Sequence, residues 1–139
     1  MIKTKQIIPT EYQEACAFVD WLELMKQQGK VLDYCHIANE SYGGTRADML
    51  RGQKLKRQGR KRGVFDYQIF AQEKIVRDLG KVKICTAPKM VCVELKKRKG
   101  GTVSPEQKHW QEVYDACDIP AKICHGAEEA IEFVERFLQ

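Results

Sequence analysis

The sequence predicts an α/β sandwich in which a mixed central sheet is flanked by helices, as one domain spanning residues 1–139. Two observations predict this class. Segments with helical and with strand periodicity are interspersed along the chain. Near the C-terminus a strand, a helix and a strand follow one another, which implies one right-handed parallel crossover. The length of 139 residues and the 43% of hydrophobic residues fit a single domain with a sizeable core.

The N-terminal part begins with a predicted helix. Apolar residues recur at helical spacing over residues 9–28, with Thr10 as the expected N-cap and Gly29 as the stop. Residues 31–37 are short, rich in apolar and aromatic side chains and bounded by turn-forming residues. We therefore expect the first strand there.

Two further segments are harder to assign from pattern alone. The chain after the first strand is polar, basic and rich in glycine, but residues 47–57 can form a helix with Leu50 and Leu55 facing inward. The mixed stretch 71–89 is expected to be a connection, with a short hairpin around Val76 and residues 82–84.

Two strands are predicted from alternation of apolar and polar side chains. Residues 64–70 place Phe65, Tyr67 and Ile69 on one face. Residues 90–96 place valines and a leucine on one face, and Cys92, Glu94 and Lys96 on the other.

The C-terminal part reads as helix, strand, helix. Ser104-Pro105-Glu106-Gln107 matches both a capping box and a proline at the first helical position, so a helix should begin there and run to about Cys117. Its expected apolar stripe is Trp110, Val113, Tyr114 and Cys117. A short strand is expected at 121–124 and a last helix at 127–138.

The charge is concentrated. The formal net charge is +5, and ten of the 24 Lys and Arg residues lie in the two stretches 54–62 and 96–99. Basic surface gathered on two segments of an otherwise acidic body is typical of a protein that binds a phosphate backbone. No apolar run is long enough to span a membrane and no signal peptide is apparent, so we expect a cytoplasmic protein without a membrane partner.

The six cysteines form no CxxC pair, and several stand in apolar runs. We expect them to be buried free thiols in a reducing compartment rather than disulfides or zinc ligands.

Three charged residues are expected to converge. Asp66 lies on the polar face of one predicted strand, and Glu94 and Lys96 lie on one face of the next. Two carboxylates supply the hard oxygen ligands that Mg²⁺ prefers, and a neighbouring lysine can orient or deprotonate a water and offset charge on a phosphodiester. An unpaired carboxylate in an apolar strand is costly, which favours a shared role for the two acids.

Longer runs of residues surround this group. They are Gly63-Val64-Phe65-Asp66, Val93-Glu94-Leu95-Lys96-Lys97, Gly100-Gly101 and Ser104-Pro105-Glu106-Gln107-Lys108-His109-Trp110, with support from Asn39-Glu40-Ser41, Lys54-Leu55-Lys56-Arg57-Gln58-Gly59 and Gly126-Ala127-Glu128-Glu129-Ala130-Ile131. Together they resemble the VRR-NUC domain of the PD-(D/E)xK nuclease superfamily over nearly the whole chain. One departure is Phe65, where the family usually has proline before the aspartate.

The resemblance implies a restriction-endonuclease-like fold and a set of site residues. Asp66 and Glu94 would bind the metal, Mg²⁺ or Mn²⁺, with the main-chain carbonyl of Leu95 as a further ligand. Lys96 would be the catalytic lysine. Gln107 matches a glutamine at the start of the following helix, although a capping box alone would also explain it. The superfamily often adds a glutamate from the first helix, which here would be Glu14, slightly favoured, or Glu11; the alternative is that neither contacts the metal.

The implied activity is a divalent-metal-dependent DNA endonuclease. The DNA-binding residues would be Lys56, Arg57, Arg60, Lys61, Arg62, Lys97, Arg98 and Lys99. Small domains of this kind resemble Holliday junction resolvases, which implies a homodimer and branched DNA as the substrate. The alternatives are a nuclease acting on linear or single-stranded DNA, a restriction-type enzyme with sequence specificity, and a non-catalytic DNA-binding module of the same fold.

Overall fold

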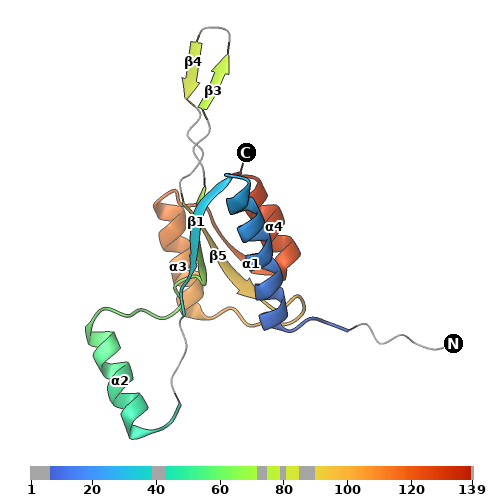
Figure 1. The fold of residues 1–139 in the computed structure, drawn as a ribbon. Helices are drawn as coiled ribbons and strands as arrows, with labels where there is room; N and C mark the ends of the chain where they lie inside the picture. Colours follow the sequence, from blue (N-terminus) through green and yellow to red (C-terminus); the bar gives the residue numbers. More distant parts are fainter. Residues whose placement is uncertain (1–6, 39–42, 72–74, 79–80, 85–89, 139) are drawn as a thin grey trace, which may run out of the picture.

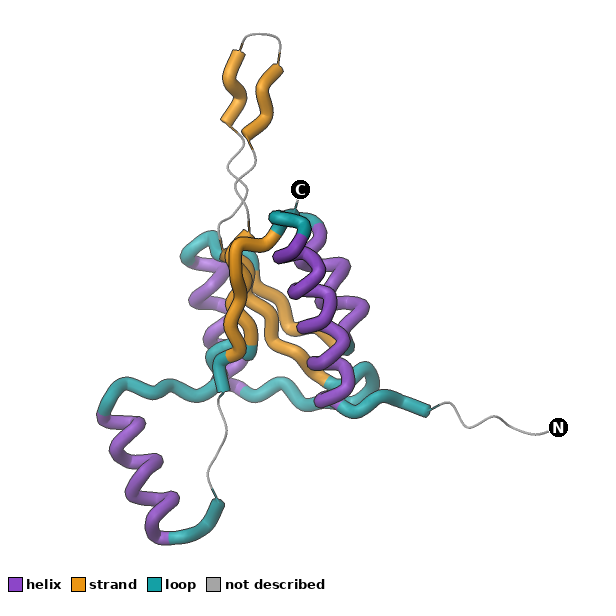
Figure 2. The backbone as a smooth tube through the Cα atoms, viewed as in Figure 1, coloured by secondary structure: helices purple, strands orange, loops and turns teal. Residues whose placement is uncertain are grey.

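A computed structural model describes residues 7–38, 43–71, 75–78, 81–84 and 90–138 (Figures 1 and 2). In chain order its elements are α1 (Glu11–Gln27), β1 (Val31–His36), α2 (Arg46–Arg57), β2 (Tyr67–Ala71), β3 (Ile75–Asp78), β4 (Lys81–Ile84), β5 (Met90–Lys96), α3 (Pro105–Ala116), β6 (Ala121–His125) and α4 (Ala127–Glu135). The expected order of helices and strands is confirmed.

The central sheet has the strand order β1-β2-β5-β6. The β1–β2 and β2–β5 pairs are antiparallel, while β5 and β6 are parallel and are joined through α3. Helices α1 and α4 lie on one face of the sheet and α3 lies on the other (Figures 1 and 2). The mixed sheet flanked by helices confirms the predicted α/β sandwich.

Two apolar clusters hold these layers together. The larger one packs α1 and α4 against the sheet, with Phe18, Leu22, Ile69, Val93 and Val134 fully buried. The smaller one lies under α3 and contains Phe65, Cys92 and Tyr114. The burial of apolar side chains in these two clusters is the main stabilising contribution to a domain of this size.

Helix boundaries follow the expected capping chemistry. Thr10 and Ser104 each accept a hydrogen bond from the backbone N–H three residues later, at 3.2 and 3.1 Å, and each belongs to a capping box. At the end of α1, Gly29 has a φ of +72°, a conformation that favours glycine. The start of α1, its stop and the start of α3 are therefore confirmed.

One strand assignment is wrong in detail. Strand β2 begins at Tyr67, so Phe65 and Asp66 precede it. Phe65 does not share a face with Tyr67 and Ile69; its ring packs edge-on against Tyr114, with the centroids 5.0 Å apart, in the cluster under α3. Side chains alternate strictly between the two faces only within a strand, and Phe65 lies outside β2.

Helix α2 also departs from expectation. It forms at 46–57, but it buries no residue, and Leu50 is 51% exposed rather than facing a core. Figure 1 shows α2 projecting away from the sandwich. The β3–β4 pair is an antiparallel hairpin, as expected, and in Figure 1 it also lies outside the sandwich.

Two sequence expectations about cysteines and membranes can be compared with the structure. The five described cysteines are free thiols, but only Cys92 and Cys124 are buried; Cys16, Cys35 and Cys117 are exposed, so Cys117 is wrongly assigned to the inner stripe of α3. Cys85 and the run 39–41 lie outside the described residues. No helix in the described part of the chain is long and apolar enough to cross a membrane.

Candidate active site

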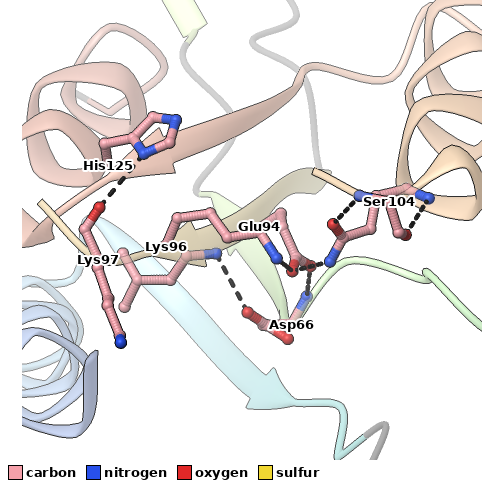
Figure 3. Close-up of polar contacts among 8 residues, drawn as sticks. Asp66, Glu94, Lys96, Lys97, Ser104 and His125 are labelled. Atoms are coloured by element: carbon pink, nitrogen blue, oxygen red, sulfur yellow. Dashed lines mark hydrogen bonds and ion pairs between the residues drawn. The ribbon is translucent and has the colours of Figure 1, made fainter. Parts of the chain in front are cut away.

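The structure brings Asp66 and Glu94 together through two reciprocal hydrogen bonds. The backbone N–H of Leu95 donates to Asp66 Oδ2 at 3.1 Å, and the backbone N–H of Asp66 donates to Glu94 Oε2 at 3.2 Å (Figure 3). These bonds lie next to the Tyr67–Val93 pair, at the end of the antiparallel β2–β5 ladder. Each acid is thus fixed by the backbone beside the other acid; the two acids converge as predicted, although Asp66 precedes β2 rather than lying on it.

Lys96 and Gln107 both contact the same oxygen of Glu94. Lys96 Nζ lies 3.2 Å from Glu94 Oε1, and its side chain is only 14% exposed. The amide Nε2 of Gln107, from the first turn of α3, donates to Glu94 Oε1 as well (Figure 3). The acid and the lysine predicted to act together are therefore neighbours in space.

Gln107 has two roles at once. Its Oε1 accepts a hydrogen bond from the backbone N–H of Ser104 at 3.0 Å, which completes the capping box of α3. Its Nε2 is then directed at Glu94. The two interpretations of Gln107 from sequence, a helix cap and a residue lining the site, are compatible because they use different atoms of the amide.

The loop before Asp66 is closely packed on α3. A Cβ at Gly63, whose φ is +80°, would lie 2.6 Å from the backbone carbonyl carbon of Glu106, so only glycine fits there. Trp110 Nε1 donates to the backbone carbonyl of Arg62 at 3.0 Å. These contacts hold the segment that carries Asp66 against the turn that carries Gln107. From sequence, Trp110 is expected only in the core.

The pKa of Glu94 is raised to about 7, first by burial and then by the charge of Asp66, while the hydrogen bond and the charge of Lys96 act to lower it. Burial also raises the pKa of Asp66, against the lowering effect of the hydrogen bond from Leu95. Two carboxyl groups and one lysine thus lie close together in a site that is largely shielded from water. A divalent cation would favour the ionised form of both acids.

The metal-free protein is expected to lose stability as the pH rises from about 4.5 to about 7. The pKa of Glu94 is higher in the folded state than its ordinary value of 4.5. Its stabilising contribution is therefore complete below pH 4.5 and is lost as the pH passes the folded-state pKa, with a total on the order of 3 kcal/mol. Urea unfolding in chelator across this range measures the loss. Glu94→Gln should flatten the profile in this window, and an unchanged profile would contradict the assignment to Glu94.

The two glutamates of α1 have different surroundings. Glu14 is 3% exposed; its Oε1 accepts from Arg98 Nε at 3.0 Å and its Oε2 accepts from the backbone N–H of Ala127 at 2.8 Å. Glu14 thereby caps the N-terminus of α4, where a carboxylate is favoured by the helix dipole. Glu11 is exposed, and its charge contributes a smaller upward shift to the pKa of Asp66, after burial.

Arg98 is expected to stabilise the fold through Glu14. Arg98→Ala would leave a buried carboxylate with one hydrogen bond fewer, so it should lower the free energy of unfolding by about 1–3 kcal/mol. Combined with Glu14→Gln, the loss should be smaller than the sum of the single losses. The neighbouring exposed cation provides a control, since Lys99→Ala should change stability by no more than about 0.5 kcal/mol. Additive losses in urea titrations would show that the pair does not interact energetically.

The predicted DNA-binding residues lie on both sides of the acids in the chain. Lys56 and Arg57 end α2, residues 60–62 precede Asp66, and residues 97–99 follow Lys96. Apart from the half-buried Arg60, all of them are exposed, although Arg98 is paired with Glu14. The backbone carbonyl of Lys97 lies 3.2 Å from His125 Nδ1, which joins the end of β5 to the end of β6 (Figure 3).

The donor set of the site is small. Within the described ranges, no three or more His, Cys, Asp or Glu side chains are grouped so as to hold a metal ion. In the described part of the chain, Asp66 and Glu94 are the two acids that hydrogen bonds hold together at this site. Two carboxylates fit Mg²⁺, which keeps several waters in its octahedral shell, better than they fit a structural zinc site with four protein ligands.

Comparison with known proteins gives a structural match. No protein-family model matches the sequence, and no curated protein matches it. The structure is similar to a solved structure described as a "VRR_NUC domain protein", with a TM-score of 0.57 and 19% sequence identity, over 93% of this chain and 88% of that chain. The chain therefore has the fold of a VRR_NUC domain protein, as its sequence motifs predicted.

Proposed function

We propose that this protein is a divalent-metal-dependent endodeoxyribonuclease that hydrolyses phosphodiester bonds in DNA. The observation that carries the proposal is the group at the β2–β5 end, where Asp66 and Glu94 are fixed side by side and Lys96 Nζ lies 3.2 Å from Glu94. The similarity in fold to a VRR_NUC domain protein supports the same conclusion.

The residues that would hold Mg²⁺ or Mn²⁺ are Asp66, Glu94 and the main-chain carbonyl of Leu95. The N–H of Leu95 is directed at Asp66. Since the N–H and C=O of one residue in a strand point to the same edge, the carbonyl of Leu95 is on the Asp66 side too. From α1, Glu11 is the better candidate for a further ligand, because both carboxylate oxygens of Glu14 are hydrogen-bonded elsewhere.

Lys96 and Gln107 have different roles in the proposed reaction. Lys96, held by Glu94, would orient an attacking water and stabilise negative charge that develops on the phosphate. Gln107 fixes the Glu94 oxygen that Lys96 contacts. A bound divalent cation supplies a Lewis acid that offsets charge on the phosphate oxygens.

DNA is the proposed substrate because cations flank the two acids. The exposed residues Lys61, Arg62, Lys97 and Lys99, with Lys56 and Arg57, can contact phosphates on either side of the scissile one. Such contacts read the shape of the backbone rather than its sequence. We therefore extend the proposal to structure-selective cleavage of branched DNA by a homodimer, as the resemblance to Holliday junction resolvases implies.

The substrate class can be tested with end-labelled four-way junction, flap, linear duplex and single-stranded DNA of shared sequence, each incubated with Mg²⁺ and with Mn²⁺. We expect the branched substrates to be cut faster than linear duplex, near the branch point. Equal rates on linear duplex would contradict structure selectivity. Tight binding with no cleavage of any substrate would favour the non-catalytic module. Sedimentation of the protein with and without junction DNA measures whether it is a dimer.

A further inference from the structure

A cavity of about 420 Å³ lies between the C-terminal part of α2, the end of β1 and the loop before β2. Its walls include Ile37, Ala38, Leu55 and Val64, and its polar lining is Gln58, Arg60 and Lys61. The volume is at the low end of the roughly 300–1,000 Å³ typical of small-molecule sites. A single nucleotide fits a space of this size, whereas a duplex does not.

The lining has the chemistry of a nucleotide site. The aliphatic side chains offer surface to a base and a sugar, and the amide of Gln58 can donate to and accept from a base edge. Arg60 and Lys61 only donate, and they carry the positive charge that a phosphate requires. Among the residues that the structure describes, no acidic side chain lines this cavity.

The cavity adjoins the proposed metal site. The backbone N–H of Ile37, in its wall, donates to the backbone carbonyl of Asp66 at 2.6 Å, and Val64 is two residues before Asp66. A strand whose scissile phosphate is at Asp66 and Glu94 would therefore place a neighbouring nucleotide at the cavity.

We propose that this cavity binds one unpaired nucleotide of a DNA strand next to the scissile phosphate, with α2 as the wall that closes around it. This proposal rests on the proposed nuclease function. It specifies the substrate as DNA in which the strand to be cut is unpaired next to the cleavage site. Because α2 buries no residue and bears several cations, a nucleic acid strand is also the partner that matches its charge.

Filling the cavity tests the proposal. Ala38 is exposed and lines the cavity, so Ala38→Trp occupies it without disturbing the core. Affinity is measured in chelator by fluorescence anisotropy, with a fluorescein-labelled fork bearing single-stranded arms and with a linear duplex of equal length. We expect Ala38→Trp to weaken binding to the fork roughly tenfold and to leave duplex binding unchanged. The matched control Ala47→Trp, on the exposed start of α2 away from the cavity, should change neither affinity.

A pair of charge variants provides a second test that does not require a tryptophan to be introduced. Lys61→Ala and Lys54→Ala each remove one exposed cation, but only Lys61 lines the cavity. Relative to its effect on duplex binding, Lys61→Ala should weaken fork binding more than Lys54→Ala does. Equal losses from both, or an Ala38→Trp protein that binds the fork as the wild type does, would overturn the proposal.

Binding in chelator does not require cleavage, so the two claims can fail separately. Loss of fork binding in Ala38→Trp without any metal-dependent cleavage by the wild type would retain the nucleotide site and reject the nuclease. Cleavage that depends on Glu94, with unchanged fork binding in Ala38→Trp, would retain the nuclease and reject the nucleotide site.

Discussion

Lys96→Ala is expected to lower the rate of DNA cleavage by roughly 10²- to 10³-fold while leaving the affinity for DNA nearly unchanged. Lys96 Nζ lies 3.2 Å from Glu94, and the side chain is 14% exposed, so it adds little to the outer basic surface. In the proposed reaction its charge offsets the negative charge that develops on the phosphodiester. Single-turnover cleavage and anisotropy in chelator measure the rate and the affinity separately.

The matched control for this change is Lys122→Ala. Lys122 is on β6 and pairs with Glu129, 3.1 Å away, so its removal also deletes one positive charge and one ion pair. Its cleavage rate should stay within a few-fold of the wild-type rate. Cleavage by Lys96→Ala at the rate of Lys122→Ala would refute the role given to Lys96.

Phe65→Ala is expected to lower the free energy of unfolding by about 3–5 kcal/mol, the usual cost of deleting a buried phenylalanine ring. Phe65 is 0% exposed and packs edge-on against Tyr114 of α3. The ring anchors the segment directly before Asp66, so cleavage should also fall under conditions where the variant is still folded. Urea unfolding monitored by circular dichroism measures the loss of stability.

A phenylalanine on the adjacent strand gives the control. Phe70 in β2 is 37% exposed, and Phe70→Ala should cost much less than Phe65→Ala. If both variants lose the same stability, Phe65 does not anchor the site. Phe65→Leu should retain most of the stability and the cleavage, because it keeps an apolar side chain in the same space.

The core of the site could be predicted from sequence because its geometry is local. Glu94 and Lys96 are two residues apart on one strand, so they share a face wherever the strand lies. The capping box at Ser104 likewise fixes where α3 begins, and hence where Gln107 is placed. The pairing of β2 with β5 was the one long-range assumption, and the register of these strands confirms it.

What could not be predicted depends on contacts between distant segments. The sequence predicts that Arg98 contacts phosphate, because it belongs to a basic run. In the structure it pairs instead with Glu14, which lies 84 positions earlier in the chain. Helical spacing predicts that Leu50 is a core residue, but α2 buries no residue, and Leu50 is 51% exposed. Spacing along the chain contains no information about either arrangement.

Metal-dependent catalysis by the Asp66–Glu94 pair can be measured by single-turnover cleavage of an end-labelled four-way junction in Mg²⁺ and in chelator, by the wild type and by Glu94→Gln. Glu94→Gln preserves the shape of the side chain but removes one of the two proposed metal-binding carboxylates. We expect cleavage by the wild type in Mg²⁺ but not in chelator, and none above background by Glu94→Gln. Cleavage that persists in chelator, or that Glu94→Gln retains, would contradict this expectation.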